Sequence, residues 1–117
     1  MRSFAVLLLA VGLVAAAPAG ASTGTTKPTT LTILVGKHGV AGGLKKFTVK
    51  KNAHVVLRIR SSIGKQVHLH GYDIERAIRN ARTYARMAFV ARVRGVFEIE
   101  LHLGGSRDLQ IGQLTVK

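Results

Sequence analysis

Apolar and polar residues alternate strictly along 97–103. The positions on the two faces are Phe97, Ile99, Leu101 and Leu103 against Glu98, Glu100 and His102. A period of two over this length predicts a β-strand with one buried face. We therefore expect Phe97, Ile99 and Leu101 to face a hydrophobic core.

Shorter apolar segments of the same kind occur along most of the chain, separated by Gly, Lys and Asn. The strand candidates are 31–35, 46–50, 54–60, 66–74, 95–103 and 109–116. Several short strands within fewer than 100 residues are typical of an all-β antiparallel sandwich. The pattern predicts about seven strands in one domain.

The segment 75–89 fits two periods. Arg79, Arg82 and Arg86 lie together on a helical wheel, opposite Ile78 and several alanines, which describes an amphipathic helix. Alternatively, a strand from about 84 to 90 would place alternate apolar residues on one side. Alanine favours helix, whereas β-branched and aromatic residues favour strand. We expect a short helical turn near 75–80 followed by a strand.

The first 21 residues have the layout of a secretory signal peptide. Arg2 is followed by the apolar run 4–17, then by Pro18 and the small residues 19–21. This run is short for a membrane span, which needs about 20 residues, although an uncleaved anchor is the alternative. We expect cleavage after Ala21, a flexible linker at 22–30 and a domain at 31–117, located in the periplasm or outside the cell.

Composition narrows the possible functions. The chain has no cysteine, so thiolate chemistry is excluded. Without Arg2 the net charge is +12, one less than that of the whole chain. Such a surface attracts polyanions through a field that salt screens. After export we expect no nucleic acid, but anionic envelope components or a protein partner. The serines and carboxylates show no catalytic arrangement, so we do not expect an enzyme.

Three of the five histidines lie in the segments VHLHGYD and FEIELH. In a strand, His68 and His70 point to the same face, roughly 6.7 Å apart along the backbone. Two imidazoles at this spacing can chelate one divalent ion, and nitrogen and carboxylate donors suit copper(II), with zinc less favoured. Asp73 is a candidate for an alternative ligand or for a carboxylate that orients one of the imidazoles. The other two histidines, His38 and His54, lie in or beside loops, and we expect both at the surface.

The segments also resemble a known family. They are similar to a small exported cupredoxin-like domain, the fold of the small blue copper proteins. The resemblance covers 31–117 and rests on KFTVKKNAHVVLRIRS, VHLHGYD, FVARVRGVFEIELH and IGQLTV. It implies a Greek-key β-sandwich in which 66–74 and 95–103 are adjacent. It also places His102 beside His68 as a third donor. Glu100 shares a face of the strand with His102 and is a candidate ligand or a group that orients an imidazole.

The resemblance carries over only one of the three strong copper ligands. His68 aligns with the first copper histidine of the family, but Leu101 stands at the cysteine position. The second histidine would fall near Gly104, where there is none, and the axial methionine position is Leu109 or Gln110. A blue site needs a thiolate with two imidazoles, so this chain cannot form one. It resembles instead the exported branch with HLHGYD and ELH that lacks this cysteine.

The hydrophobic pattern and the resemblance disagree about His68. The pattern buries Val67 and Leu69, which leaves His68 and His70 exposed, whereas the resemblance turns His68 to the interior. A bulge at Gly71 could reconcile the two.

Two hypotheses remain. One is a metal-binding domain that uses His68, His70 and His102 at a non-blue site. The other is a metal-free sandwich, with the histidines bonded to carboxylates, whose basic surface docks to an anionic envelope component or to a protein.

Overall fold

The computed structural model describes residues 12–17, 19–20 and 26–117, and its regular structure consists of nine β-strands. They are β1 (Thr29–Gly36), β2 (Gly39–Val40), β3 (Lys45–Val49), β4 (His54–Ser61), β5 (Gln66–Leu69), β6 (Ile74–Ala77), β7 (Ala85–Val90), β8 (Gly95–Gly104) and β9 (Arg107–Val116). The count is higher than the seven expected, because β2 and β6 are short additional strands.

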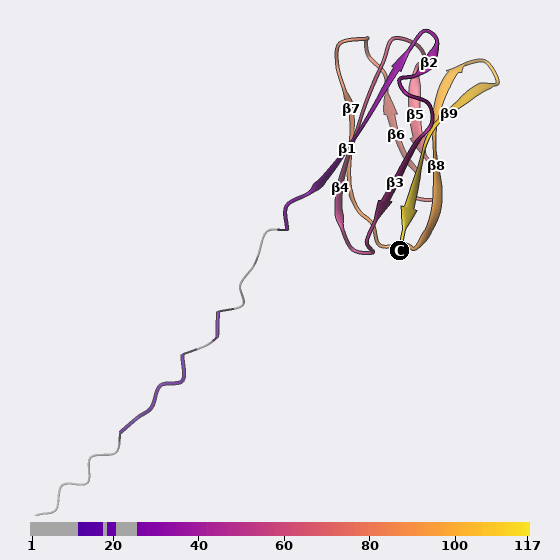
Figure 1. The fold of residues 1–117 in the computed structure, drawn as a ribbon. Helices are drawn as coiled ribbons and strands as arrows, with labels where there is room; N and C mark the ends of the chain where they lie inside the picture. Colours follow the sequence, from indigo (N-terminus) through magenta and orange to yellow (C-terminus); the bar gives the residue numbers. More distant parts are fainter. Residues whose placement is uncertain (1–11, 18, 21–25) are drawn as a thin grey trace, which may run out of the picture.

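The strands form two sheets that pack face to face (Figure 1). The four-stranded sheet has the order β2-β1-β4-β7, and the five-stranded sheet has the order β3-β9-β8-β5-β6. Two neighbouring pairs, β1–β4 and β3–β9, are parallel, which the expected antiparallel sandwich did not include. The predicted adjacency of 66–74 and 95–103 is confirmed, since β5 and β8 pair antiparallel.

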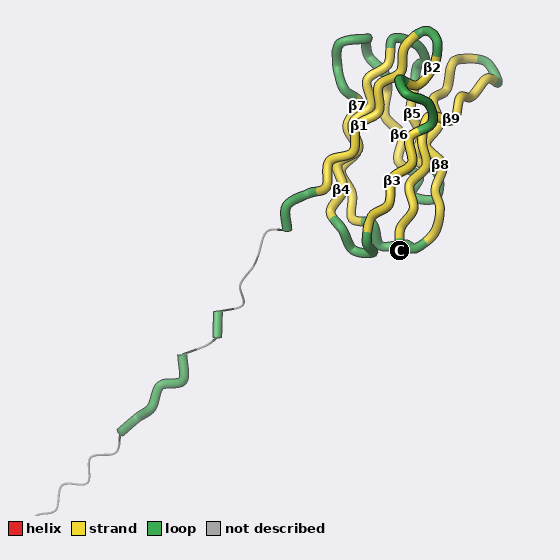
Figure 2. The backbone as a smooth tube through the Cα atoms, in the orientation of Figure 1, coloured by secondary structure: helices red, strands yellow, loops and turns green. Residues whose placement is uncertain are grey.

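The expected helical turn near 75–80 is wrong. Ile74–Ala77 forms β6, which pairs with β5 through Leu69 and Ile74, and the described part of the chain contains no helix (Figure 2). Pairing with β5 completes the sheet and overrides the helical preference of the alanines. The strand alternative for the rest of the segment is correct, because β7 buries Ala85 and Met87.

The core lies between the two sheets and consists of aliphatic side chains from both. Ile33, Leu57 and Ile59 face it from the four-stranded sheet, and Ile99 and Leu101 face it from the five-stranded sheet, all fully or almost fully buried. The alternation of 97–103 thus predicted the correct face. Phe97 is half-buried and packs against the edge of this core.

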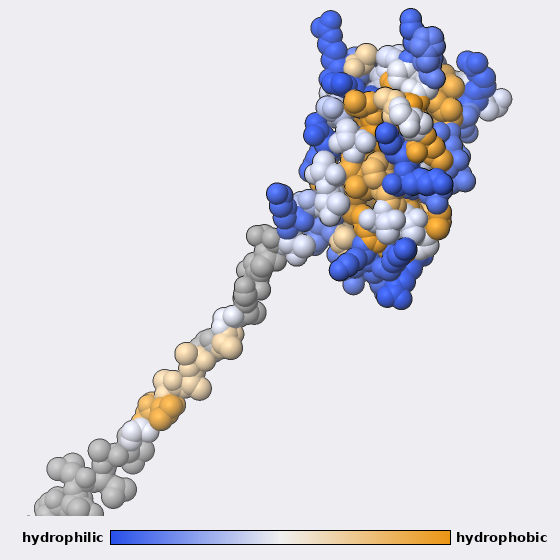
Figure 3. Space-filling model, in the orientation of Figure 1, coloured by the Kyte–Doolittle hydropathy of each residue, from blue (hydrophilic) through white to orange (hydrophobic). Residues whose placement is uncertain are grey.

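Hydrophilic and apolar residues are unevenly distributed over the surface (Figure 3). In the space-filling view, hydrophilic residues crowd both ends of the sandwich, whereas apolar residues reach the surface in the middle of the face shown (Figure 3). Leu34 and Leu44 are among the larger apolar side chains that are exposed.

Most of the expected signal peptide lies outside the described residues. Its described parts, 12–17 and 19–20, are exposed and form neither helix nor strand. Within the residues that the structure describes, no helix has the length and hydropathy required to cross a membrane. Residues 26–28 of the expected linker have no regular structure, and β1 begins at Thr29, two residues before the expected start of the domain.

Candidate metal centre

The predicted histidines lie on the outer face of the five-stranded sheet. Val67 and Leu69 are 0% exposed in the core, and successive side chains of a strand point to opposite faces, so His68 points outward. The hydrophobic pattern therefore predicted the correct face. The interior position implied by the alignment with the cupredoxin-like family is wrong, because Val67 fills that place.

His68 has a carboxylate beside it on each neighbouring strand. It is the direct partner of Glu75 on β6 and of Glu100 on β8. Its Nδ1 lies 3.9 Å from Oε1 of Glu75. The Gln66 side-chain amide donates a 2.8 Å hydrogen bond to the other oxygen of Glu75, which fixes the carboxylate against the sheet.

His102 on β8 brings a second imidazole to the same place. The ring centroids of His68 and His102 are 6.0 Å apart. His68, Glu75 and His102 each offer one ligand atom, and these three atoms lie within 4.8 Å of one another. The structure thus groups two of the predicted histidines with a carboxylate from β6.

Asp108 on β9 orients His102. The Nδ1 atom of His102 lies 2.5 Å from Oδ1 of Asp108, and since a carboxylate accepts, Nδ1 carries the proton and donates it. The hydrogen bond to Asp108 is the main cause that raises the pKa of His102 above its usual 6.5, with the charges of Asp108 and Glu100 adding to it. In the neutral ring this tautomer leaves Nε2 free to bind a metal ion.

His70 stands next to the group without joining it. Its ring centroid lies 4.2 Å from that of His68, and its Nε2 is 2.8 Å from Oε2 of Glu100. This nitrogen is buried, yet the angles of the contact do not satisfy a hydrogen bond. The protein thus leaves this nitrogen without a hydrogen-bond partner, which is uncommon for a buried polar atom.

The remaining candidates lie elsewhere. Asp73 is exposed in the turn between β5 and β6, with a φ of 51°, and does not belong to the group of convergent donors. His38 and His54 are both exposed. His38 lies in the turn between β1 and β2, and His54 is the first residue of β4. These three strands belong to the four-stranded sheet, not to the sheet that carries His68 and His102.

The donor set fits a borderline divalent cation. Two imidazoles and one carboxylate are ligands of copper(II) and zinc. In a tetrahedral site with bonds of 2.0–2.1 Å, the ligand atoms are roughly 3.4 Å apart. The donors of His68, Glu75 and His102 lie within 4.8 Å of one another, so they would have to close by up to roughly 1.4 Å around an ion. Side-chain rotation can supply a movement of this size.

Reasoning from the sequence missed Glu75 and Asp108. A strand at 74–77 folded back from His68 would have placed Glu75 opposite it, but the helical reading of this segment hid the pairing. Asp108 is opposite His102 only because the β8–β9 register shifts between His102 and Gly104. A regular hairpin that pairs Gly104 with Arg107 would have put Leu109 there, so no simple sequence signal identifies Asp108.

Comparison with known proteins bears on the fold. No protein-family model matches the chain, and no curated protein matches its sequence. It is similar to the apo form of a copper-binding protein solved by NMR, with 15% identity and a TM-score of 0.53 over 78% of this chain and 91% of that one. It is also similar to a chain of a heme-copper terminal oxidase dimer solved by cryo-EM, with 16% identity and a TM-score of 0.50 over 75% of this chain and 64% of that one. At this level of identity the likeness shows the fold alone, an all-β, cupredoxin-like sandwich.

Proposed function

We propose that this chain is an exported cupredoxin-like domain that binds a divalent metal ion, copper(II) in preference to zinc, on the outer face of its five-stranded sheet. His68, Glu75 and His102 would supply the direct donors. His70 lies beside this group without joining it, and Glu100 adds a negative charge that favours a cation. The domain would hold or pass copper outside the cytoplasm and would not be an enzyme.

The observation that carries this proposal is the hydrogen bond between His102 and Asp108. A metal-binding histidine commonly donates its second ring nitrogen to a carboxylate, which fixes the ring and makes the free nitrogen a stronger donor. Here the free Nε2 belongs to the ring that forms a group with His68 and Glu75. This hydrogen bond supports the proposal that His102 is a metal ligand and that Asp108 orients it.

Copper is favoured over zinc because the affinity of nitrogen and oxygen donors rises along the divalent series to copper(II). The proposed donor set contains no sulfur, because the chain has no cysteine and Met87 is buried in the core. Bound copper(II) would therefore give the spectrum of a nitrogen and oxygen site, without an intense blue band.

Electron paramagnetic resonance tests this proposal on protein produced without an affinity tag and loaded with one equivalent of copper(II). We expect hyperfine coupling from two imidazole nitrogens, reduced to one in His68→Ala and in His102→Ala. His38→Ala, which removes an exposed histidine from the opposite sheet, should leave the spectrum unchanged. A spectrum of hydrated copper(II) in the unmodified protein would contradict the proposal.

A second function has its own support in the distribution of charge. The basic surface would dock a metal-free domain to an anionic component of the cell envelope or to a protein. All five acidic residues of the sequence belong to β6, β8, β9 or the turn before β6, so the four-stranded sheet bears no negative charge. Binding to anionic vesicles that weakens steeply with added salt would support this function, because the attraction would be screened. Binding that is insensitive to salt would contradict it.

A further inference from the structure

The described arginines form no ion pair with a carboxylate of the protein. Within residues 26–117, the ion pairs all join a histidine to a carboxylate, and none involves Lys or Arg. The guanidinium groups that cluster on one side of the sandwich are therefore not paired with a carboxylate.

The strongest cluster surrounds a hollow between the two sheets' edge strands. β6 is the last strand of one sheet and β7 the last strand of the other, and residues 78–84 connect them. The hollow has a volume of about 320 Å³. We call it the arginine hollow. The residues that line it are Arg76, Ala77, Arg79, Thr83, Tyr84, Ala85 and Arg86.

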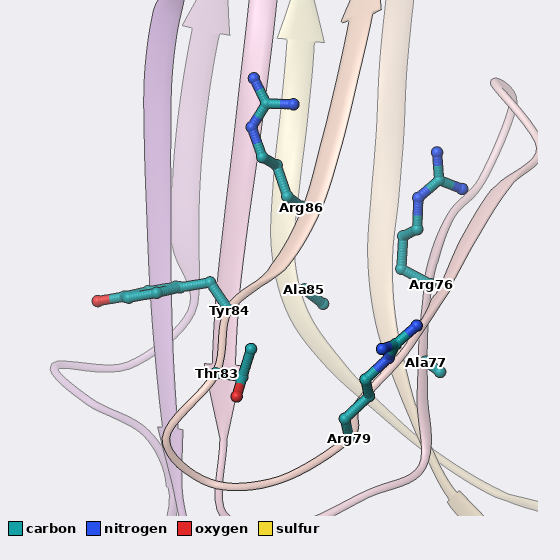
Figure 4. Close-up of a pocket in the computed structure, with 7 residues that line it drawn as sticks. All are labelled: Arg76, Ala77, Arg79, Thr83, Tyr84, Ala85 and Arg86. Atoms are coloured by element: carbon teal, nitrogen blue, oxygen red, sulfur yellow. The ribbon is translucent and has the colours of Figure 1, made fainter.

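Three arginines from three separate segments line this hollow (Figure 4). Arg76 comes from β6, Arg79 from the connection and Arg86 from β7. Arg76 donates a 2.7 Å hydrogen bond to the backbone carbonyl of Glu75, which uses one of its five N–H donors. The hollow therefore combines a charge of three with many donors and contains no acidic side chain.

The connection between the two strands is held in place by hydrogen bonds. Oδ1 of Asn80 accepts from the backbone of Arg82 and from both the backbone and the hydroxyl of Thr83, each at 2.9 Å. At the start of the connection, the Ile78 amide donates to the carbonyl of Lys65. Arg79 and Thr83 are thus carried by a closed turn rather than by a loose loop.

Tyr84 forms a wall of the hollow and is itself fixed by two further arginines. The guanidinium carbon of Arg58 lies 4.0 Å from the centre of the Tyr84 ring, and that of Arg60 lies 5.2 Å from it. These cation–π contacts hold the ring on the outer face of the four-stranded sheet.

The same face places two positive charges directly against each other. Arg58 on β4 and Arg86 on β7 are cross-strand partners, and like charges in this position destabilise a sheet. A bound anion would remove that repulsion, whereas the protein itself supplies no carboxylate there.

We propose that the arginine hollow is a binding site for a phosphate group, either free or carried by a larger molecule as a phosphate ester. Guanidinium forks match the oxygens of phosphate in pairs, and the hollow is large enough for this tetrahedral anion. The site is independent of the metal centre. Where the phosphate belongs to an envelope lipid, this proposal rests on the docking function and names the chemical group that the docking surface recognises.

Protection of the open edges of β6 and β7 is another use of surface charge, since charged side chains discourage edge-to-edge pairing. The two roles differ in what they require. Edge protection needs positive charge, which lysine supplies equally well, whereas paired recognition of phosphate oxygens needs the planar arginine fork.

The test is therefore a substitution that keeps the charge. In Arg79→Lys/Arg86→Lys, the affinity for inorganic phosphate, measured by calorimetry at an ionic strength fixed with chloride, should fall about tenfold, the loss expected for paired charge-assisted hydrogen bonds. Arg92→Lys/Arg94→Lys, in the exposed loop at the other end of β7, is the matched control and should leave the affinity unchanged. Equal affinities in the two double variants and the unmodified protein would overturn the proposal.

Vesicles of phosphatidylcholine with phosphatidylglycerol separate the two sources of phosphate. If vesicle binding falls in Arg79→Lys/Arg86→Lys together with phosphate affinity, the site takes a lipid headgroup. If only the affinity for inorganic phosphate falls, the site takes a soluble phosphate or phosphate ester, and the docking function does not use it. If neither changes while vesicle binding is still sensitive to salt, the site is disproved and docking by diffuse charge survives.

Discussion

Leu101 and His68 lie on adjacent strands but point to opposite faces of the five-stranded sheet. Leu101 is the direct partner of Val67, and both are completely buried in the core. His68 therefore projects outward, towards Glu75 and His102. A ligand at position 101, which the resemblance aligns with the cysteine of the small blue copper proteins, could not reach an ion held by His68.

This geometry predicts the outcome of placing a cysteine at position 101. Leu101→Cys should not produce the intense blue band of a copper–thiolate site, because the sulfur would lie in the core on the far side of the sheet. The variant should lose about 2–3 kcal/mol of unfolding free energy through the cavity that it creates. Visible spectra of the copper-loaded variant decide the question, and an intense blue band would show that His68 faces inward.

The hydrogen bond from His102 to Asp108 predicts two effects of pH. Because the pKa of His102 is raised in the folded protein, this pair stabilises the fold at low pH, and the contribution is lost as pH rises through the folded pKa. Copper(II) competes with the proton for the His102 imidazole. When the solution is acidified, the affinity for copper(II) should therefore begin to fall while the pH is still above 6.5.

Asp108→Asn isolates this interaction. The substitution should lower the pKa of His102, which NMR titration of the imidazole protons measures. It should also weaken copper binding about tenfold, the lower end of the range for loss of a carboxylate that orients a metal ligand. A pKa of His102 that is the same in both proteins would contradict the assignment of Asp108 as its partner.

The turn between β5 and β6, which follows the HLH segment, depends on Gly71 for its conformation. This residue has a φ of 81°, and a Cβ added to it would lie only 2.3 Å from a ring carbon of Phe97. Gly71→Ala should cost about 1–2 kcal/mol from the backbone conformation and a further ~1–3 kcal/mol from the clash. Chemical denaturation measures the loss.

Gly43→Ala is the matched control for that variant. Gly43 has a φ of 83° but no atom within 4 Å of an added Cβ, so it should show only the backbone cost. Equal losses in the two variants would mean that Phe97 does not pack over the turn.

Tyr72 ties the same turn to the loop before β8. Its hydroxyl donates to the carbonyl of Val93 at 2.8 Å and accepts from the Val93 amide at 3.1 Å, while its ring packs on Phe89 and Phe97. Tyr72→Phe should therefore lower the free energy of unfolding by about 1 kcal/mol. Tyr84→Phe should be nearly neutral, since the Tyr84 ring contributes through Arg58. A neutral Tyr72→Phe would contradict the role of its hydroxyl.

The alternation of apolar residues predicted the fold and one side of the candidate site. Phe97, Ile99 and Leu101 were placed on the core-facing side of their strand, and Val67 and Leu69 identified the outward face of His68. Such patterns are reliable because a shift of one residue would exchange the buried and exposed faces of a whole strand.

What the sequence did not predict depends on pairing between strands. Glu75 reaches His68 through the β5–β6 hairpin, in a segment whose alanines and arginines also fit a helix. Asp108 reaches His102 through a shift in the register of β8 and β9. Such shifts arise from the packing of the complete sheet, so the composition of either strand alone does not reveal them.

Calorimetric titration with copper(II) tests the central claim most directly, on a pair of double variants that each lack two histidines. His68→Ala/His102→Ala removes both imidazoles of the proposed site, and His38→Ala/His54→Ala removes the two exposed histidines outside it. We predict that the first variant loses tight binding and that the second keeps the affinity and the one-to-one stoichiometry of the unmodified protein. An unchanged affinity in His68→Ala/His102→Ala would contradict the metal centre.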